Sequence, residues 1–366
     1  MSPSEDHSPR YFSSIQVLRG MAAVLVVVYH LVDAERLYGQ GQALLSGIAR
    51  LGYAGVDVFF VISGFVMTTI AAGQYRSIKN AGVFLARRAI RILPLYWFYT
   101  SAVVALLVLA PTAVGTMYHE KSVLASYLLW PQDSFPLLQV GWTLIYEAYF
   151  YILMALAISV LNERWVPIFL GAWAAALVSL QSVHVSTPWQ AVLANPMGWE
   201  FIAGGLIGIY WKRVPARLGH WCLPVGVAGF VGGAATLSHL GLYDQDALRR
   251  ALIFGSSSAL VVVGLLVREQ RRLFKPHRLL RAVGDASYSI YLSHLFVVTA
   301  AAHVWGRSHL NTTGLEHVVF ITATLVLAIA VGTASFHWLE SPASRIFGGL
   351  LKKVGNPVMH KQLSHP

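Results

Sequence analysis

The chain has 366 residues, of which 56% are hydrophobic and only 12% are charged. An ordinary soluble domain carries about 25% charged residues, because its surface must remain in contact with water. The composition therefore excludes a soluble globular protein. It predicts an all-α integral membrane protein, in which each spanning segment satisfies its own backbone hydrogen bonds.

The net charge of +11 is the second constraint on function. A basic balance can indicate nucleic-acid binding. In this chain, however, Lys and Arg stand between apolar runs, where such residues set topology and contact anionic lipids. We therefore expect membrane lipids among the partners and no nucleic acid. The single cysteine, Cys222, excludes an internal disulfide and a paired thiolate site, and we expect no bound metal or cofactor.

The chain contains ten apolar windows long enough to cross a membrane. In order, they are residues 15–33, 51–72, 92–111, 141–161, 165–181, 190–211, 222–240, 250–267, 285–305 and 314–338. Arg19 interrupts the first window and no convincing cleavage site follows it, so we predict a retained helix rather than a signal peptide. This pattern predicts a flexible cytoplasmic tail (1–14), one transmembrane domain (15–345) and a second cytoplasmic tail (346–366).

The orientation of these helices follows from the basic residues. With the N-terminus in the cytoplasm, 21 of the 27 Lys and Arg residues fall on the inner side. This asymmetry and the even number of helices predict that both termini are cytoplasmic. The longest outer segment, near residues 112–140, contains His119, Glu120 and Asp133 and is a candidate cap over an outward-facing cavity.

The first helix contains two ionisable residues, which are costly inside a membrane and indicate a function. Arg19 and His30 are eleven residues apart, so they project from nearly the same face and are separated by about 16 Å along the axis. This spacing predicts Arg19 near the inner surface and His30 in the outer half of the membrane. Asp33 is a candidate to orient His30, because it lies three residues further along the helix.

Two carboxylates are predicted at the depth of His30. The second and fourth helices begin GYAGVDVFFVISGF (52–65) and GWTLIYEAYFY (141–151) and run inward, which places Asp57 and Glu147 about 9 Å below the outer surface. A histidine beside carboxylates is a usual arrangement for a general base. Taken alone, His30 is equally well explained by a structural hydrogen bond. Asp57 alone fits a pairing with a neighbouring helix or a proton path.

A cluster of arginines lies on the inner side, in the segment FLARRAIRILPLYW (84–97) that precedes the third predicted helix. Arg87, Arg88 and Arg91 span one helical turn, and three guanidinium groups are well suited to phosphates. A positive-inside anchor explains the same pattern. Glu340, near the end of the last helix, is a candidate partner for one of these arginines.

Together these segments resemble the membrane acyltransferase 3 family, bacterial O-acyltransferases that modify surface polysaccharides, lipopolysaccharide O-antigen and lipo-oligosaccharide signals. The matching segments run in order over residues 15–345: Arg19 with His30 after ten residues, GVDVFFVISGF, RRAIR before Pro94, GWTLIYEAYF, SYSIYLSHLF and ESPASR. The chain looks most like the exopolysaccharide-production branch. It departs from the family at Thr143, where serine is common, and in having the single acid Glu147 after it; this bears on the acceptor more than on the reaction.

The resemblance implies a ten-helix O-acyltransferase of the bacterial inner membrane, with acetyl-CoA as the usual co-substrate and His30 as an essential residue. The acceptor is then a sugar hydroxyl of a surface or exopolysaccharide, or of a lipid-linked oligosaccharide precursor. No periplasmic hydrolase-like domain is expected after the last helix. The acceptor sugar, the acyl group, the side of transfer and the choice between direct transfer and an acetyl-His30 intermediate remain open.

On this reading, we predict the following site residues. The catalytic group consists of His30, Arg19, Asp57 and Glu147; the donor-binding group consists of Arg87, Arg88 and Arg91; the acceptor or cavity lining consists of Trp142, Tyr146, Tyr291 and His294. His294 is predicted near the middle of the membrane. The alternative is a transporter or flippase for a polysaccharide precursor, because buried charges suit that function equally well. A non-catalytic scaffold explains Arg19 and His30 less well.

Overall fold

The computed structural model describes residues 12–40, 43–45, 47–110, 121–243, 246–308 and 310–354. In this part of the chain every regular element is helical, which confirms the predicted all-α fold. The elements are α1 (Ser13–Tyr38), η1 (Gly47–Ala54), α2 (Gly55–Ala71), α3 (Ile78–Leu109), α4 (Val123–Tyr127), η4 (Gln139–Gly141), α5 (Trp142–Val160), η5 (Glu163–Trp165), α6 (Val166–Leu180), α7 (Pro188–Leu193), α8 (Gly198–Tyr210), η6 (Trp211–Arg213), α9 (Ala216–His239), α10 (Ala247–Arg250), η7 (Ala251–Gly255), α11 (Ser256–Gln270), α12 (Arg278–Asp285), α13 (Ser287–Arg307), α14 (Gly314–Ser335), η8 (Phe336–Glu340) and α15 (Ser341–Val354).

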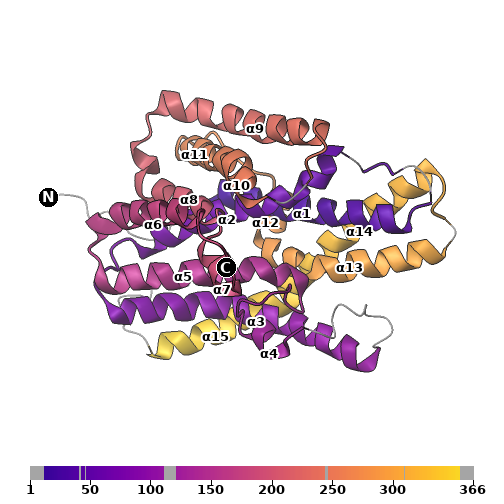
Figure 1. The fold of residues 1–366 in the computed structure, drawn as a ribbon, viewed down its shortest axis with the longest axis horizontal. Coiled ribbons are helices and arrows are strands. Elements are labelled where there is room, and N and C mark those ends of the chain that lie inside the picture. Colours follow the sequence, from indigo (N-terminus) through magenta and orange to yellow (C-terminus); the bar gives the residue numbers. More distant parts are fainter. Residues whose placement is uncertain are drawn as a thin grey trace.

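Ten helical segments in the described part are long and apolar enough to cross a membrane, as the sequence predicts. They are Ser13–Tyr38, Gly47–Ala71, Ile78–Leu109, Gln139–Val160, Glu163–Leu180, Pro188–Arg213, Ala216–His239, Ala247–Gln270, Ser287–Arg307 and Gly314–Leu351. Most of the long helices run roughly along the longest axis of the molecule, with α9 at one edge and α15 at the opposite edge (Figure 1). Their outward faces expose large apolar side chains such as Trp221 and Val326, which suit contact with lipid.

The third spanning helix begins earlier than predicted. α3 starts at Ile78, where the Ser77 side chain caps the helix by accepting a hydrogen bond from the Asn80 N–H at 3.2 Å. The expectation that the arginine cluster precedes the third helix, which was placed at 92–111, is therefore wrong. Arg87, Arg88 and Arg91 lie within α3, and Pro94 lies inside the same helix. A helix of 32 residues is about 48 Å long, which exceeds the hydrocarbon thickness of a bilayer.

At both ends of the chain, helix extends past the predicted boundaries of the transmembrane domain. α1 begins at Ser13, where the Glu269 carboxylate accepts hydrogen bonds from the backbone and hydroxyl groups of Ser13 and Ser14. At the other end, α14 continues through the π-helical turn η8 into α15, so residues 346–354 of the predicted tail are helical. Residues 1–11 and 355–366 of the predicted tails lie outside the described residues. So do His119 and Glu120 of the predicted cap.

Glycines set the closest approaches between helices. A Cβ atom on Gly64 of α2 would lie 2.1 Å from the carbonyl oxygen of Phe201, and one on Gly204 of α8 would lie 2.0 Å from that of Val61. α1 also packs closely on α12, since a Cβ atom on Gly20 would lie 2.9 Å from the backbone nitrogen of Gly284. Small residues at these points let the helix backbones approach, which is how helices associate when lipid removes the hydrophobic driving force.

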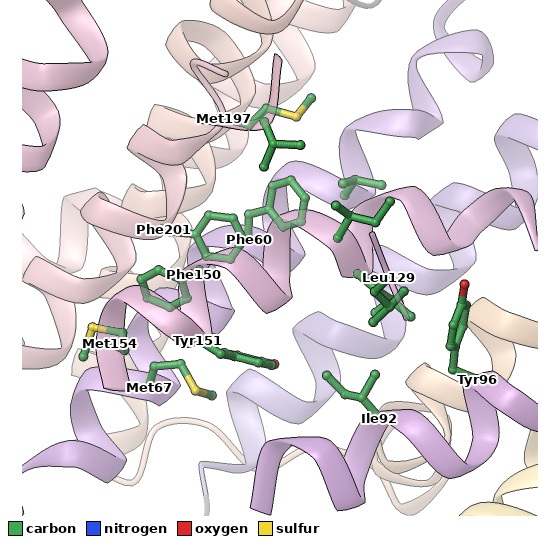
Figure 2. Packing of buried hydrophobic residues seen from close by; sticks show 14 of the residues in the cluster. Phe60, Met67, Ile92, Tyr96, Leu129, Phe150, Tyr151, Met154, Met197 and Phe201 are labelled. Atoms are coloured by element: carbon green, nitrogen blue, oxygen red, sulfur yellow. The ribbon is translucent and has the colours of Figure 1, made fainter. Parts of the chain in front are cut away.

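Aromatic side chains fill the space between α2, α5 and α8. The Phe201 ring stacks between Phe60 and Phe150, with centroid distances of 4.5 and 4.6 Å. Figure 2 shows these three rings in sequence, with Tyr151 and Met67 on the side facing α3. This packing fixes α2 and α5 relative to each other and so holds the polar side chains of their other faces in place.

Candidate active site

A cavity lies between α1, α2, α3, α5 and α13. Its polar lining consists of Arg19, Ser63, Arg88, Arg91, Thr143, Glu147, Tyr151, Tyr288 and Tyr291. Along α2 the lining extends from Val56 to Met67, a rise of about 16 Å, so the cavity is elongated parallel to the helices. Its two ends differ in character: arginines line one end, and Tyr291 lies at the other.

Three arginines give the cavity an excess of positive charge. In the described part of the chain, none of Arg19, Arg88 and Arg91 forms an ion pair with a carboxylate. Arg19 donates to the Gln16 side chain at 3.3 Å, and the buried Nε of Arg88 has no hydrogen-bond partner. Guanidinium groups that lie inside a membrane without a paired carboxylate favour the binding of an anion.

Glu147 is the carboxylate that lines this cavity. It accepts hydrogen bonds from Ser63 at 2.8 Å and from Tyr151, and it interacts electrostatically with Arg19 and Arg88. Glu340 is not among the residues that line the cavity. It accepts a hydrogen bond from Ser289 at 2.6 Å and interacts electrostatically with Arg91 and Arg19. The predicted pairing of Glu340 with the arginines is therefore present as a longer-range interaction, and the cavity lining itself remains positive.

Asp57 does not lie beside His30. It is fully buried and forms a bidentate ion pair with Arg250, through Nε at 3.3 Å and a terminal guanidinium nitrogen at 2.7 Å. The Tyr53 ring covers the same guanidinium at 4.6 Å. The alternative that Asp57 pairs with a neighbouring helix is what the structure shows. Arg250 is itself 1% exposed, so both members of the ion pair are buried.

A second buried carboxylate, Glu200 of α8, adjoins this ion pair. It is 1% exposed and interacts electrostatically with Asp57 and Arg250. The side chain packs against the π-helical turn η7, where a Cβ atom on Gly255 would lie 2.8 Å from its Cγ. The two carboxylates, Asp57 and Glu200, therefore connect α2 and α8 to the turn before α11 through one buried guanidinium, that of Arg250.

The neighbours of His30 are aromatic. Its ring centroid lies 4.9 Å from that of Tyr29 and 5.1 Å from that of His294 on α13. Among the described residues, His294 is also its electrostatic neighbour, and no hydrogen bond to a carboxylate is present. Asp33, the predicted orienting residue, is exposed and interacts with Arg36 and Arg50.

The register between α1 and α2 explains why the predicted layer of His30, Asp57 and Glu147 is wrong. Gly55 packs on Ala22 and Val26, so Asp57 is level with about residue 22 of α1. That position is about 12 Å from the level of His30. Ser63 lies six residues further along α2, so its partner Glu147 is displaced by about 20 Å, towards Arg19. The prediction placed all three residues at one depth because it counted residues from the predicted helix ends. That count does not include the offset between α1 and α2 along their axes.

The remaining predicted residues divide into two groups. Arg88, Arg91 and Tyr291 line the cavity, whereas Arg87, Trp142, Tyr146 and His294 are not among its lining residues. Tyr146 accepts a hydrogen bond from Asn195 at 3.0 Å and packs edge-on against the Trp142 ring at 5.8 Å. Tyr291 contacts the hydroxyl of Thr143 at 2.9 Å and lies 6.0 Å from the ring of His294.

Several residues of the site were missed from the sequence. Ser63, Tyr151 and Tyr288 line the cavity, but as uncharged residues in apolar helices they gave no distinct signal. The pairing of His30 with His294 depends on a helix contact that the sequence alone does not show. Gly20 and Gly284 are in contact, and each stands ten residues before a histidine.

Comparison with known proteins agrees with the predicted resemblance. The acyltransferase 3 family model, described as an acyltransferase domain, matches residues 12–335. The exopolysaccharide production protein ExoZ of Rhizobium meliloti is 35% identical over 309 residues, which cover 81% of this chain and 90% of that protein. Nodulation protein 10 of Rhizobium leguminosarum bv. viciae is 26% identical over 96% of this chain and 99% of its own length. The O-acetyltransferase OatA of Staphylococcus aureus is 24% identical over 95% of this chain, which spans 60% of the length of OatA. No solved structure matches.

The ten apolar helices and the cationic cavity between them define a multi-pass membrane protein with a buried, positively charged cavity. The extent of the family match and the similarity to ExoZ make the assignment specific: the chain belongs to the acyltransferase 3 family and is an O-acyltransferase.

Proposed function

We propose that the protein transfers an acetyl group from cytoplasmic acetyl-CoA to a sugar hydroxyl of an exopolysaccharide or its lipid-linked precursor. The observation on which this rests is the set of Arg19, Arg88 and Arg91 in one cavity, with the buried Nε of Arg88 unpartnered. Phosphates and the diphosphate of a CoA thioester are anions of the kind that guanidinium groups bind best. The excess of Lys and Arg on this side of the helices supports a cytoplasmic opening in a bacterial inner membrane.

The elongated shape of the cavity indicates how the donor would lie in it. With its phosphates at the arginine end, the thiol-bearing arm of the donor runs along α2 towards Tyr291. The ring of His294 follows Tyr291, and His30 follows His294. The thioester thus approaches the histidines from one side of the membrane. His30, which is partly exposed, receives the acceptor from the other.

In this proposal His30 is the general base. It takes the proton of the sugar hydroxyl while the hydroxyl oxygen attacks the thioester carbonyl. The C–S bond then breaks, and the proton passes from His30 to the departing CoA thiolate. A route through acetyl-His30 uses the same residue as nucleophile and has the same overall balance.

The sugar acceptor is inferred from relatives. ExoZ is named for exopolysaccharide production and OatA as an O-acetyltransferase, and ExoZ is similar to this chain over 90% of its own length. We assign recognition of the acceptor to the aromatic pair that Trp142 and Tyr146 form beside Asn195. Aromatic faces with a polar rim are suited to sugar rings.

Release of free CoA thiol tests the proposed function. Purified protein in nanodiscs is mixed with acetyl-CoA and with exopolysaccharide isolated from a strain that lacks the gene. We expect thiol release that requires both substrates, together with a gain of about 42 mass units per modified sugar. A His30→Ala protein serves as the blank. A transporter or flippase releases no thiol under these conditions, so the absence of thiol release from intact protein overturns the proposal.

A further inference from the structure

The pair of His30 and His294 is the feature of the site that neither the family match nor the predicted carboxylate layer accounts for. His294 is fully buried and His30 is partly exposed, and their ring centroids are 5.1 Å apart with the planes inclined by 41°. In the described part of the chain, no carboxylate is hydrogen-bonded to either ring. A general base that becomes protonated in a membrane needs a group that accepts its second N–H, and a carboxylate usually serves.

The hydrogen bonds of His294 fix which of its nitrogens carries the proton. Nδ1 lies 2.7 Å from the carbonyl oxygen of Tyr291 and 3.3 Å from that of Ile290. Carbonyl oxygens only accept hydrogen bonds, so Nδ1 is the protonated donor. In the neutral ring Nε2 then bears a lone pair, and this buried atom has no hydrogen-bond partner. An unpartnered buried acceptor beside a reacting group calls for an explanation.

The packing of α1 against α12 and α13 brings the two rings together. Gly20 and Gly284 are in close contact, and the helices that follow them run in the same direction. Ten residues after each glycine stands a histidine, so the two side chains reach the same level. Tyr291 lies one turn earlier on α13 and lines the cavity, so His294 stands between the cavity and His30.

We infer that His294 is a positioning residue for His30, with its Nε2 lone pair taking the place of the carboxylate in a conventional catalytic triad. This inference rests on the proposed function. When His30 takes the proton from the acceptor hydroxyl, its other ring N–H donates to Nε2 of His294, which stabilises the imidazolium. The proton then leaves His30 for the CoA thiolate as the C–S bond breaks. The backbone carbonyls of Tyr291 and Ile290 keep His294 in the tautomer that accepts.

Two amide substitutions separate this role from a structural one. In His294→Gln the amide reaches the position of Nε2, whereas in His294→Asn it reaches only that of Nδ1. If the lone pair supports His30, the Gln protein retains more activity than the Asn protein. If His294 serves only to hold α13 through its bond to the Tyr291 carbonyl, the Asn protein retains more. His294→Phe removes both nitrogens and keeps the ring.

The rates are measured as CoA thiol release by the full-length protein in nanodiscs, with acetyl-CoA and exopolysaccharide from the deletion strain. We expect His294→Phe to lower kcat about 10- to 100-fold with the KM for acetyl-CoA within twofold of wild type, and Gln to recover part of the loss. In a His30→Ala background the Phe substitution has no further effect, because both act in one step.

Two results overturn the inference: a wild-type kcat for His294→Phe, or an Asn protein at least as active as the Gln protein. The comparison of Gln with Asn remains decisive even if the Phe protein does not fold. Failure of the proposed function is distinguishable, because wild-type protein would then release no thiol.

Discussion

The two ends of the site are built differently. At the arginine end, charged side chains from α1, α3 and α5 face a cavity, and their positive excess follows from residue type alone. At the histidine end, two rings from α1 and α13 meet where the helices pack together, and their contact depends on helix register. The first arrangement tolerates small shifts, since charge acts over distance. The second does not, because the proposed hydrogen bond from the protonated His30 to His294 would be lost if one helix slid by a residue.

The largest expected effect concerns the histidine end. His30→Ala should lower kcat by 10²- to 10⁴-fold, the usual contribution of a general base, and leave acetyl-CoA binding unchanged. Thiol release gives kcat, and calorimetric titration with acetyl-CoA gives the affinity. Equal losses of binding and turnover would show that the two ends of the site are not separable.

The ion pair of Asp57 with Arg250 should matter for stability more than for chemistry. Removing one partner of a buried pair costs about 3–5 kcal/mol, because the other charge is left without compensation. Asp57→Ala is therefore expected to lower the melting temperature in detergent clearly, and the double change Asp57→Ala with Arg250→Met to recover much of it. A melting temperature unchanged by Asp57→Ala would mean that the pair does not hold α2 against α10.

Substitutions at the arginine end should act on the donor. Arg88→Gln or Arg91→Gln removes a charge-assisted contact worth about 1.5–3 kcal/mol, so the KM for acetyl-CoA should rise about 10- to 100-fold with little change in kcat. Arg87→Gln, one residue away but outside the lining, and Arg217→Gln, exposed on α9, are the matched controls. A rise of the same size in a control protein would point to general surface charge rather than to the cavity.

The smallest expected effect belongs to Ser63. Its hydrogen bond to Glu147 at 2.8 Å is a single contact in a network that Tyr151 also supports. Ser63→Ala should therefore change the KM for acetyl-CoA by about fivefold, which corresponds to about 1 kcal/mol. Steady-state kinetics at several donor concentrations would show it, and a loss of kcat instead would place Ser63 in the transfer step.

The sequence by itself determined the membrane class, the ten spanning helices and the family, because hydropathy and residue type are properties of each segment alone. Tertiary structure decided which side chains interact with one another. It paired Asp57 with Arg250, moved Glu147 to the arginine end and brought His294 to His30. It also extended α3 back to Ile78. The physical reason is that the offset between neighbouring helices is set by close packing at residues such as Gly20, Gly55 and Gly284, and one chain's periodicity does not contain that offset.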